Sequence, residues 1–170
     1  APYGWAPRPS PDFPLMLELH SRTLIHPAWN CDIDIHHYWP GFIGDATEAF
    51  EALWRRRERV AIAEVEVDTT GTADTALVLA LHSLREAGHR DAQSRQMRDY
   101  AYLRDRLRGD AVLSRAVLES ATDTGALQTA LPLLLDLGFR IIEDTEPSEE
   151  LRRWRLHVHA RHRMTAWLLE

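Results

Sequence analysis

Residues 31–42 read CDIDIHHYWPGF, and two carboxylates and two histidines fall within six of them. Because side chains alternate between the faces of a strand, Asp32, Asp34 and His36 would share one face and the apolar residues between them the other. A charged face of this kind is typical of a divalent-cation or proton-transfer site. It is also what an antiparallel strand shows when its polar face simply meets water. The segment therefore indicates a candidate site, but it does not by itself specify a reaction.

Composition narrows the classes of protein to consider. The chain has 170 residues, of which 45% are hydrophobic, as expected for a globular protein with a real core. Its net charge of −6 argues against a general nucleic-acid binder. No apolar run is long enough to span a membrane and no signal segment opens the chain, so we expect a cytoplasmic protein without a membrane partner. Cys31 is the single cysteine, which excludes an internal disulfide, and it is expected to face the core.

Strand signals lie in the first seventy residues. Residues 1–14 contain five prolines, which oppose regular structure and indicate an extended arm. The alternation over 15–19 predicts a strand that pairs with a strand over 31–38. Residues 60–67, VAIAEVEV, are also strand-like. Their alternation slips at residues 63–64, which predicts a tight turn or a bulge there.

Helix signals begin at Asp45. Glu48 follows three residues later, and this spacing predicts a capped helix start. The apolar stripe of this helix is expected to comprise Ala49, Phe50, Leu53 and Trp54. From about residue 72 the pattern is helical throughout. Asp74 is expected to cap a largely apolar helix that stops at Gly88. Further helices are predicted over 91–107, 110–121 and 126–137, and from Pro147 onward.

These patterns predict an α+β fold with a small β-sheet region followed by a mostly helical bundle. Residues 1–70 would form the β-rich part together with the proline-rich arm. Residues 71–170 would form the helical bundle region. We expect both regions to make one compact unit.

Three stretches resemble a known family: HPAWNCDIDIHHYWPGF (26–42), EALWRRRERVAI (51–62) and ALVLALHSLREAGH (76–89). They are similar to the central and C-terminal part of the uncharacterised nucleotidyltransferase-like proteins, distant relatives of the DNA polymerase beta superfamily. In that superfamily a Gly-Ser motif and a first pair of aspartates lie on one strand, and a third acidic residue lies on a later strand. The DIH triplet matches the later strand, which implies that Asp34 has the third-carboxylate role, with Asp32 as an adjacent candidate.

The resemblance implies a magnesium ion and a nucleoside triphosphate such as ATP. Magnesium prefers hard oxygen ligands and leaves positions for substrate phosphates, as nucleotidyl transfer requires. Asp34 and Asp32 are thus the candidate catalytic residues, and His36 joins them as a candidate metal ligand. Arg55 and Arg57 are the candidate residues for binding the nucleotide. The second substrate would be an unidentified acceptor: a small molecule, a peptide or an RNA.

The chain also departs from the family pattern. No Gly-Ser followed by Asp-x-Asp precedes Cys31, and GTAD at 71–74 has the wrong order. Either that part of the catalytic domain lies in a missing N-terminal segment or a partner chain, or this is a degenerate member. In both cases the metal site of this chain alone is expected to be incomplete.

Three classes of function follow from these observations. The first is a nucleotidyltransferase-like protein that transfers a nucleoside monophosphate from a nucleoside triphosphate to an acceptor. The second is a non-catalytic binding or interaction module derived from the same fold. The third is a metal-dependent hydrolase in which Asp32, Asp34 and His36 are joined by a histidine from a helix.

Overall fold

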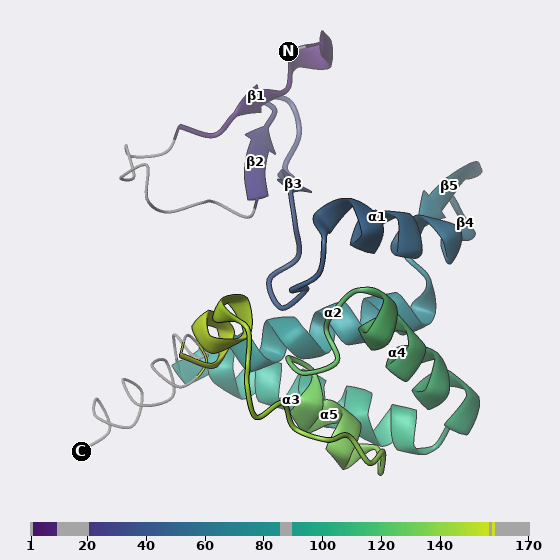
Figure 1. Ribbon diagram of the computed structural model, residues 1–170. Helices are drawn as coiled ribbons and strands as arrows, with labels where there is room; N and C mark the ends of the chain where they lie inside the picture. The colour runs from purple at the N-terminus through teal and green to yellow at the C-terminus, as the bar shows by residue number, and fades with distance from the viewer. Residues whose placement is uncertain (1, 10–20, 86–89, 157, 159–170) are drawn as a thin grey trace. The chain divides into compact units, whose positions relative to one another are not determined.

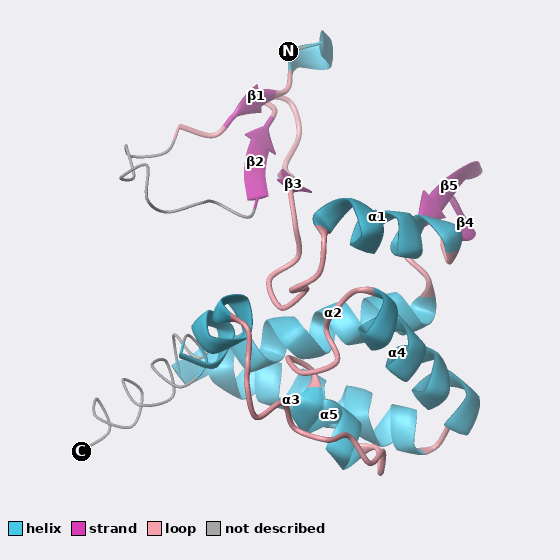
Figure 2. Cartoon of the chain, viewed as in Figure 1, coloured by secondary structure: helices cyan, strands magenta, loops and turns pink. Residues whose placement is uncertain are grey.

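The computed structural model describes residues 2–9, 21–85, 90–156 and 158, with the backbone alone for 90–97 (Figure 1). The strands, all antiparallel, lie within the first seventy residues and most of the described helices follow them, so the chain is α+β as expected (Figure 2). It divides into two compact units, Ala1–Pro40 and Gly41–Glu170, and each is described by itself.

The first unit is a three-stranded antiparallel sheet in the order β1-β2-β3, preceded by a 3-10 turn at Pro2–Gly4. The strands are β1 (Ala6–Pro7), β2 (Ser21–Ile25) and β3 (Ile33–His36). The expected strand over 31–38 thus shortens to four residues, and it pairs with β2. The strand expected over 15–19 lies outside the described residues.

The second unit begins with α1 (Ala46–Arg55), whose start follows the expected cap. The Asp45 carboxylate accepts hydrogen bonds from the backbone N–H groups of Thr47 and Glu48, at 2.9 and 3.0 Å. The expected apolar stripe is wrong in part. Ala49, Ala52 and Leu53 are buried, whereas Phe50 and Trp54 are exposed and stack on each other, with ring centroids 6.0 Å apart.

A β-hairpin follows, made of β4 (Glu58–Ile62) and β5 (Val65–Thr69). The slip in alternation at residues 63–64 is a tight turn, as predicted. Both Ala63 and Glu64 have positive φ, the conformation that a two-residue hairpin loop needs. The register places four exposed apolar residues on one face, in two cross-strand pairs: Val60 with Val67 and Ile62 with Val65.

Helices make up the remainder of the second unit. They are α2 (Thr72–Arg85), α3 (Arg90–Arg108), α4 (Ala111–Asp123), α5 (Leu131–Asp136) and a last helical segment at 149–156. The helix predicted over 126–137 is therefore shorter. It starts after Thr129, whose hydroxyl donates to the carbonyl oxygens of Gly41 and Ala126 (2.6 and 3.0 Å), and a proline occupies its first turn.

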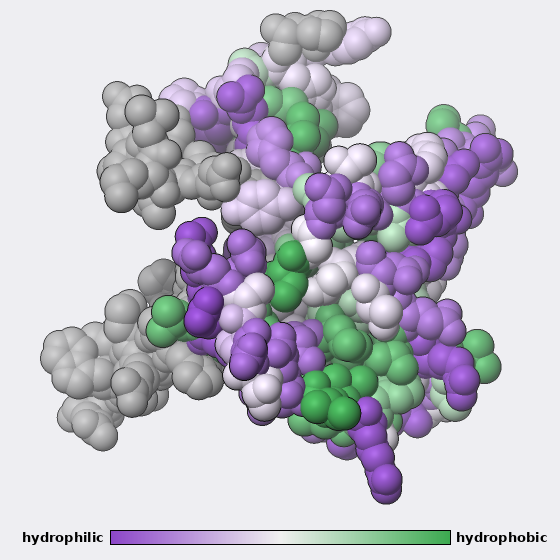
Figure 3. Space-filling view, in the orientation of Figure 1, coloured by the Kyte–Doolittle hydropathy of each residue, from purple (hydrophilic) through white to green (hydrophobic). Residues whose placement is uncertain are grey.

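The core of this unit lies where α2 packs against α3 and α4, with α5 closing it. Its fully buried side chains include Leu77, Leu81, Leu107, Val117 and Leu134. In the space-filling view some apolar surface remains over α5, where Leu135 is exposed (Figure 3). No helix among the described residues is both long and apolar enough to cross a membrane.

Asp74 does not cap α2, contrary to the sequence-based expectation. The helix already begins at Thr72, and the Asp74 side chain is only 1% exposed. Its carboxylate accepts hydrogen bonds from Arg56 (Nη2, 2.8 Å) and from the Ser120 hydroxyl (2.5 Å). The cap role is taken instead by the carboxylate of Glu58, which accepts from the Thr72 backbone N–H at 2.9 Å.

Arg56 also explains where the two units divide. Its guanidinium additionally donates to Asp123 at the end of α4, at 2.6 Å. Partial burial acts to lower the pKa of Arg56, but the hydrogen bonds and charges of Asp74 and Asp123 raise it above its ordinary value. Because this charged residue ties α1 to α2 and α4, α1 and the hairpin belong with the helices. The two compact units meet at residue 40, and the change from strand to helix patterns near residue 70 falls within the second unit.

We expect Asp74→Ala to lower the free energy of unfolding by roughly 3–5 kcal/mol, because it leaves the part-buried Arg56 guanidinium without its main counter-charge. Urea denaturation followed by tryptophan fluorescence measures this. Glu149→Ala is the matched control, because it removes an exposed i,i+4 pair with Arg153 and should change the free energy of unfolding little. Equal losses for the two variants would contradict the structural role assigned to Asp74.

A second expectation concerns Tyr100 on α3. Burial, together with the nearby Asp136 carboxylate, raises the pKa of Tyr100 to about 12. The unfolded chain ionises near 10 while the folded chain still holds the proton, so this residue's contribution to stability is complete below pH 10 and is lost as pH rises toward 12.

An alkaline titration of tyrosine absorbance should therefore contain a late phase near pH 12 that disappears in Tyr100→Phe. Tyr102→Phe is the control, because Tyr102 lies on the same helix and is 68% exposed. Removing Tyr102 should leave the late phase intact. A late phase that survives in Tyr100→Phe would show that Tyr100 is not the shifted group.

Candidate functional site

The candidate site lies on the polar face of the β1-β2-β3 sheet. In the β2-β3 register Asp34 is opposite Thr23 and His36 is opposite Ser21, so Asp34 and His36 share a face as the alternation predicted. Asp32 lies one residue before β3. The backbone N–H of Arg8 donates to the Thr23 carbonyl oxygen at 2.9 Å, which extends the pairing of β1 and places Arg8 in the same cross-strand row as Thr23 and Asp34.

Each of the two carboxylates has a partner on a neighbouring strand or its extension. The Thr23 hydroxyl donates to Asp34 Oδ1 at 2.5 Å, and the guanidinium of Arg8 forms an ion pair with the Asp32 carboxylate. Both contacts are exposed, with about half of the Arg8 and Asp32 side-chain surface reachable by solvent. Such contacts contribute little to folding, typically less than about 1 kcal/mol. The site therefore holds two oriented carboxylates that solvent and ligands can reach.

His36 is arranged differently from the aspartates. Its imidazole stacks on the indole of Trp39, with ring centroids 3.9 Å apart and planes 20° from parallel. This stacking fixes the ring plane. Throughout the part of the chain that the structure describes, there is no group of three or more His, Cys, Asp or Glu side chains that could hold a metal ion. The prediction that Asp32, Asp34 and His36 bind magnesium thus depends on further ligands, such as phosphate oxygens and water.

An aromatic cluster lies in the same unit. Trp5 contacts the rings of His26 and Trp29, at centroid distances of 5.3 and 6.2 Å. The His26 Nδ1 accepts a hydrogen bond from the Ala28 backbone N–H at 3.0 Å, so the imidazole shapes the β2-β3 connection. Cys31, in this connection, is exposed, so the expectation that it faces the core is wrong.

The two arginines predicted to bind nucleotide belong to the second unit. Arg55 lies exposed in the last turn of α1. The Arg57 guanidinium lies 4.3 Å from the ring centroid of Trp54, donates to the Trp54 carbonyl oxygen (2.9 Å) and forms an ion pair with Asp68 at 3.4 Å. Arg57 would have to give up Asp68 before it could bind a phosphate, whereas Arg55 would not.

Sequence reasoning missed Thr23 and Arg8, the two residues that orient the carboxylates. Thr23 lies 11 residues from Asp34, and Arg8 lies 24 residues from Asp32. The alternation of SRTLI over 21–25 was the available signal for β2, since it places Ser21 and Thr23 on one face. Nothing local pointed to Arg8, which lies in a proline-rich stretch.

The site has to be interpreted from its own residues, because the chain matches no family model, no curated protein and no solved structure. Its donor set suits a hard cation in part. Two carboxylates supply the oxygen ligands that magnesium prefers, while an imidazole is a ligand better suited to transition metals. The arrangement can orient an attacking hydroxyl or hold part of a metal's coordination shell.

We expect magnesium and ATP, titrated together into this chain, to show no binding in the low micromolar range, because two carboxylates and one imidazole are too few ligands for tight magnesium binding. Isothermal titration calorimetry measures this. Asp34→Asn and the exposed control Asp105→Asn should behave like the unsubstituted chain. Tight magnesium-dependent binding that is lost only in Asp34→Asn would mean that the chain contains a self-sufficient site.

Proposed function

We propose that this chain carries the third-carboxylate strand of a magnesium-dependent nucleotidyltransferase, with Asp34 as the central residue. The observation that carries the proposal is the polar sheet face, on which an exposed Asp34 carboxylate is held by Thr23 beside a second carboxylate, Asp32. The DIDIH motif supports it, because the motif resembles the corresponding strand of nucleotidyltransferase-like proteins. The proposed fold is likewise nucleotidyltransferase-like.

Each residue of the sheet face would have a separate role. The Thr23 hydroxyl donates a hydrogen bond to Asp34 Oδ1, so the other carboxylate oxygen, Oδ2, would face the substrates. When bound, magnesium would neutralise triphosphate oxygens and acidify the attacking hydroxyl. Asp34 would orient that hydroxyl and accept its proton as the acceptor oxygen bonds to the α-phosphorus and the bond to pyrophosphate breaks. Asp32 is the second candidate ligand, and the rest of the site would come from outside the described residues.

Arg8 would bind a phosphate of the nucleotide. Its guanidinium offers a planar pair of donors that suits a phosphate as well as a carboxylate. Because the pair with Asp32 is exposed and weak, exchanging Asp32 for a triphosphate oxygen would cost little. This exchange would free Asp32 for the metal at the moment the nucleotide binds.

A second function, a non-catalytic interaction module, is favoured by a different observation. On the β4-β5 hairpin Val60, Ile62, Val65 and Val67 form an exposed apolar face. Arg59, Glu66 and Asp68 lie on the other face, where Arg59 forms ion pairs with both acidic residues. An apolar strand face of this kind suits a protein partner.

The decisive experiment measures transfer of labelled nucleotide from ATP to an acceptor, or to the protein itself, by the complete protein, in which the segment or partner chain that supplies the first aspartate pair is present. We expect Asp34→Asn to lower the transfer rate at least about 100-fold, the usual cost of losing a positioned acid–base side chain. The melting temperature should change little, because the Thr23–Asp34 contact is exposed.

Asp105→Asn serves as the matched control, because Asp105 is an exposed carboxylate on α3 that pairs with its neighbour Arg104. This variant should retain transfer in full. Undiminished transfer by Asp34→Asn would show that other residues carry out the reaction. Absence of transfer by the unsubstituted protein, with capture of a partner that is lost in Val65→Glu, would favour the interaction module instead.

A further inference from the structure

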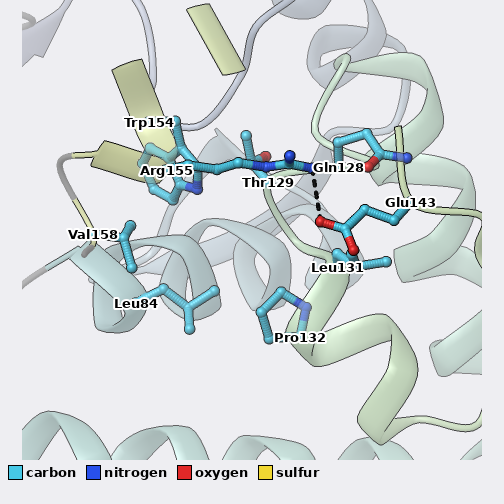
Figure 4. A pocket seen from close by; sticks show the side chains of 9 residues that line it. All are labelled: Leu84, Gln128, Thr129, Leu131, Pro132, Glu143, Trp154, Arg155 and Val158. Atoms are coloured by element: carbon cyan, nitrogen blue, oxygen red, sulfur yellow. Dashed lines mark ion pairs between the residues drawn. The ribbon is translucent and has the colours of Figure 1, made fainter. Parts of the chain in front are cut away.

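The second unit contains a cavity of about 230 Å³ that the function proposed above does not use (Figure 4). One side is apolar and is formed by Leu84 of α2, by Leu131 and Pro132 of α5, and by Trp154 and Val158 of the C-terminal region. The other side is polar and carries Gln128, Glu143 and Arg155. The cavity thus combines an apolar wall with one concentrated polar edge, as small-molecule sites do.

The polar edge is held in place by Gln128. Its side-chain amide donates to the Ile142 carbonyl oxygen at 2.9 Å and accepts from the Asp144 backbone N–H at 3.1 Å. These two contacts bracket Glu143 on both sides along the chain. Glu143 is therefore presented to Arg155, and its Oε1 lies 3.2 Å from Arg155 Nη2. Figure 4 shows this ion pair as a dashed line.

Arg155 retains donor capacity at this edge. Its Nη2 atom is buried, and its contact with Glu143 does not have the geometry of a hydrogen bond; nor does any other described residue accept one from it. Burying a donor without an acceptor is costly. An acceptor oxygen supplied by a ligand would remove this cost, while the nearby Glu143 carboxylate could accept from a donor on the same ligand.

Size and charge restrict what such a ligand can be. A dry cavity of about 150 Å³ binds benzene, so this one has room for a single ring with a small substituent. The flat indole of Trp154 suits an aromatic ring. Because Arg155 is already neutralised by Glu143, an anionic ligand would bring a second negative charge beside Glu143, and a cationic ligand would compete with Arg155.

We propose that this cavity binds a neutral, ring-sized molecule that presents a hydrogen-bond acceptor beside a donor, as an aromatic carboxamide does. The ring would lie against Leu84, Pro132 and Trp154. The carbonyl oxygen would accept from Arg155 Nη2, and the amide N–H would donate to Glu143. This inference is independent of the nucleotidyltransferase proposal, since neither Asp34 nor Asp32 is involved.

The test uses the whole chain and three probes of similar size: benzamide, benzoate and toluene. Binding is measured by ligand-observed NMR titration. We expect benzamide to bind saturably and more tightly than either of the others. In Arg155→Met the affinity for benzamide should fall about tenfold or more, the cost of losing a hydrogen bond to a charged donor.

Two further variants keep the proposal falsifiable. Arg153→Met is the matched control, because Arg153 lies on the same helical segment, pairs with Glu149 and does not line the cavity. It should bind benzamide normally. Leu84→Phe fills the apolar side while retaining Arg155, and it should abolish binding. The proposal is overturned if benzoate binds more tightly than benzamide, if the two arginine variants bind equally, or if Leu84→Phe still binds.

Discussion

The carboxylate of Asp74 is buried inside the second unit, and its charge is balanced by Arg56. Burying a charge is tolerated only where a counter-charge and hydrogen bonds replace water. The donors come from the end of α1 and from Ser120 on α4, so three helices must be in place before Asp74 is satisfied. The close approach extends to the backbone: a Cβ on Gly71, just before α2, would lie 2.6 Å from the Arg56 carbonyl oxygen.

The candidate site depends on contacts of the opposite kind. Asp34 and Asp32 are exposed, and their partners Thr23 and Arg8 can be exchanged for other ligands at little cost. The contacts that stabilise the fold of the second unit are therefore separate from those that orient the candidate site. The network around Asp74 maintains the fold of the second unit, while the carboxylates of the first unit remain available for a substrate or a metal ion.

Both functional proposals would account for apolar strand faces that are exposed in this chain. Ile33 and Ile35 are exposed on the face of β3 opposite the carboxylates, and the β4-β5 hairpin exposes four more apolar side chains. Two-stranded hairpins are rarely stable alone. Partners for these faces would cover the exposed apolar side chains, whether they complete a catalytic domain or belong to another protein.

Sequence alone determined the features that depend on near neighbours: the shared face of Asp34 and His36, the Asp45 cap and the turn at residues 63–64. Alternation and capping act over two to four residues, so a pattern reveals them. Tertiary structure alone decided the rest. Asp74 became a buried partner of Arg56, 18 residues away, and Arg8 reached Asp32 across 24 residues. Phe50 and Trp54 stayed exposed because α1 buries the side that carries Ala49, Ala52 and Leu53. No local rule encodes which distant groups meet, since that depends on how whole elements pack.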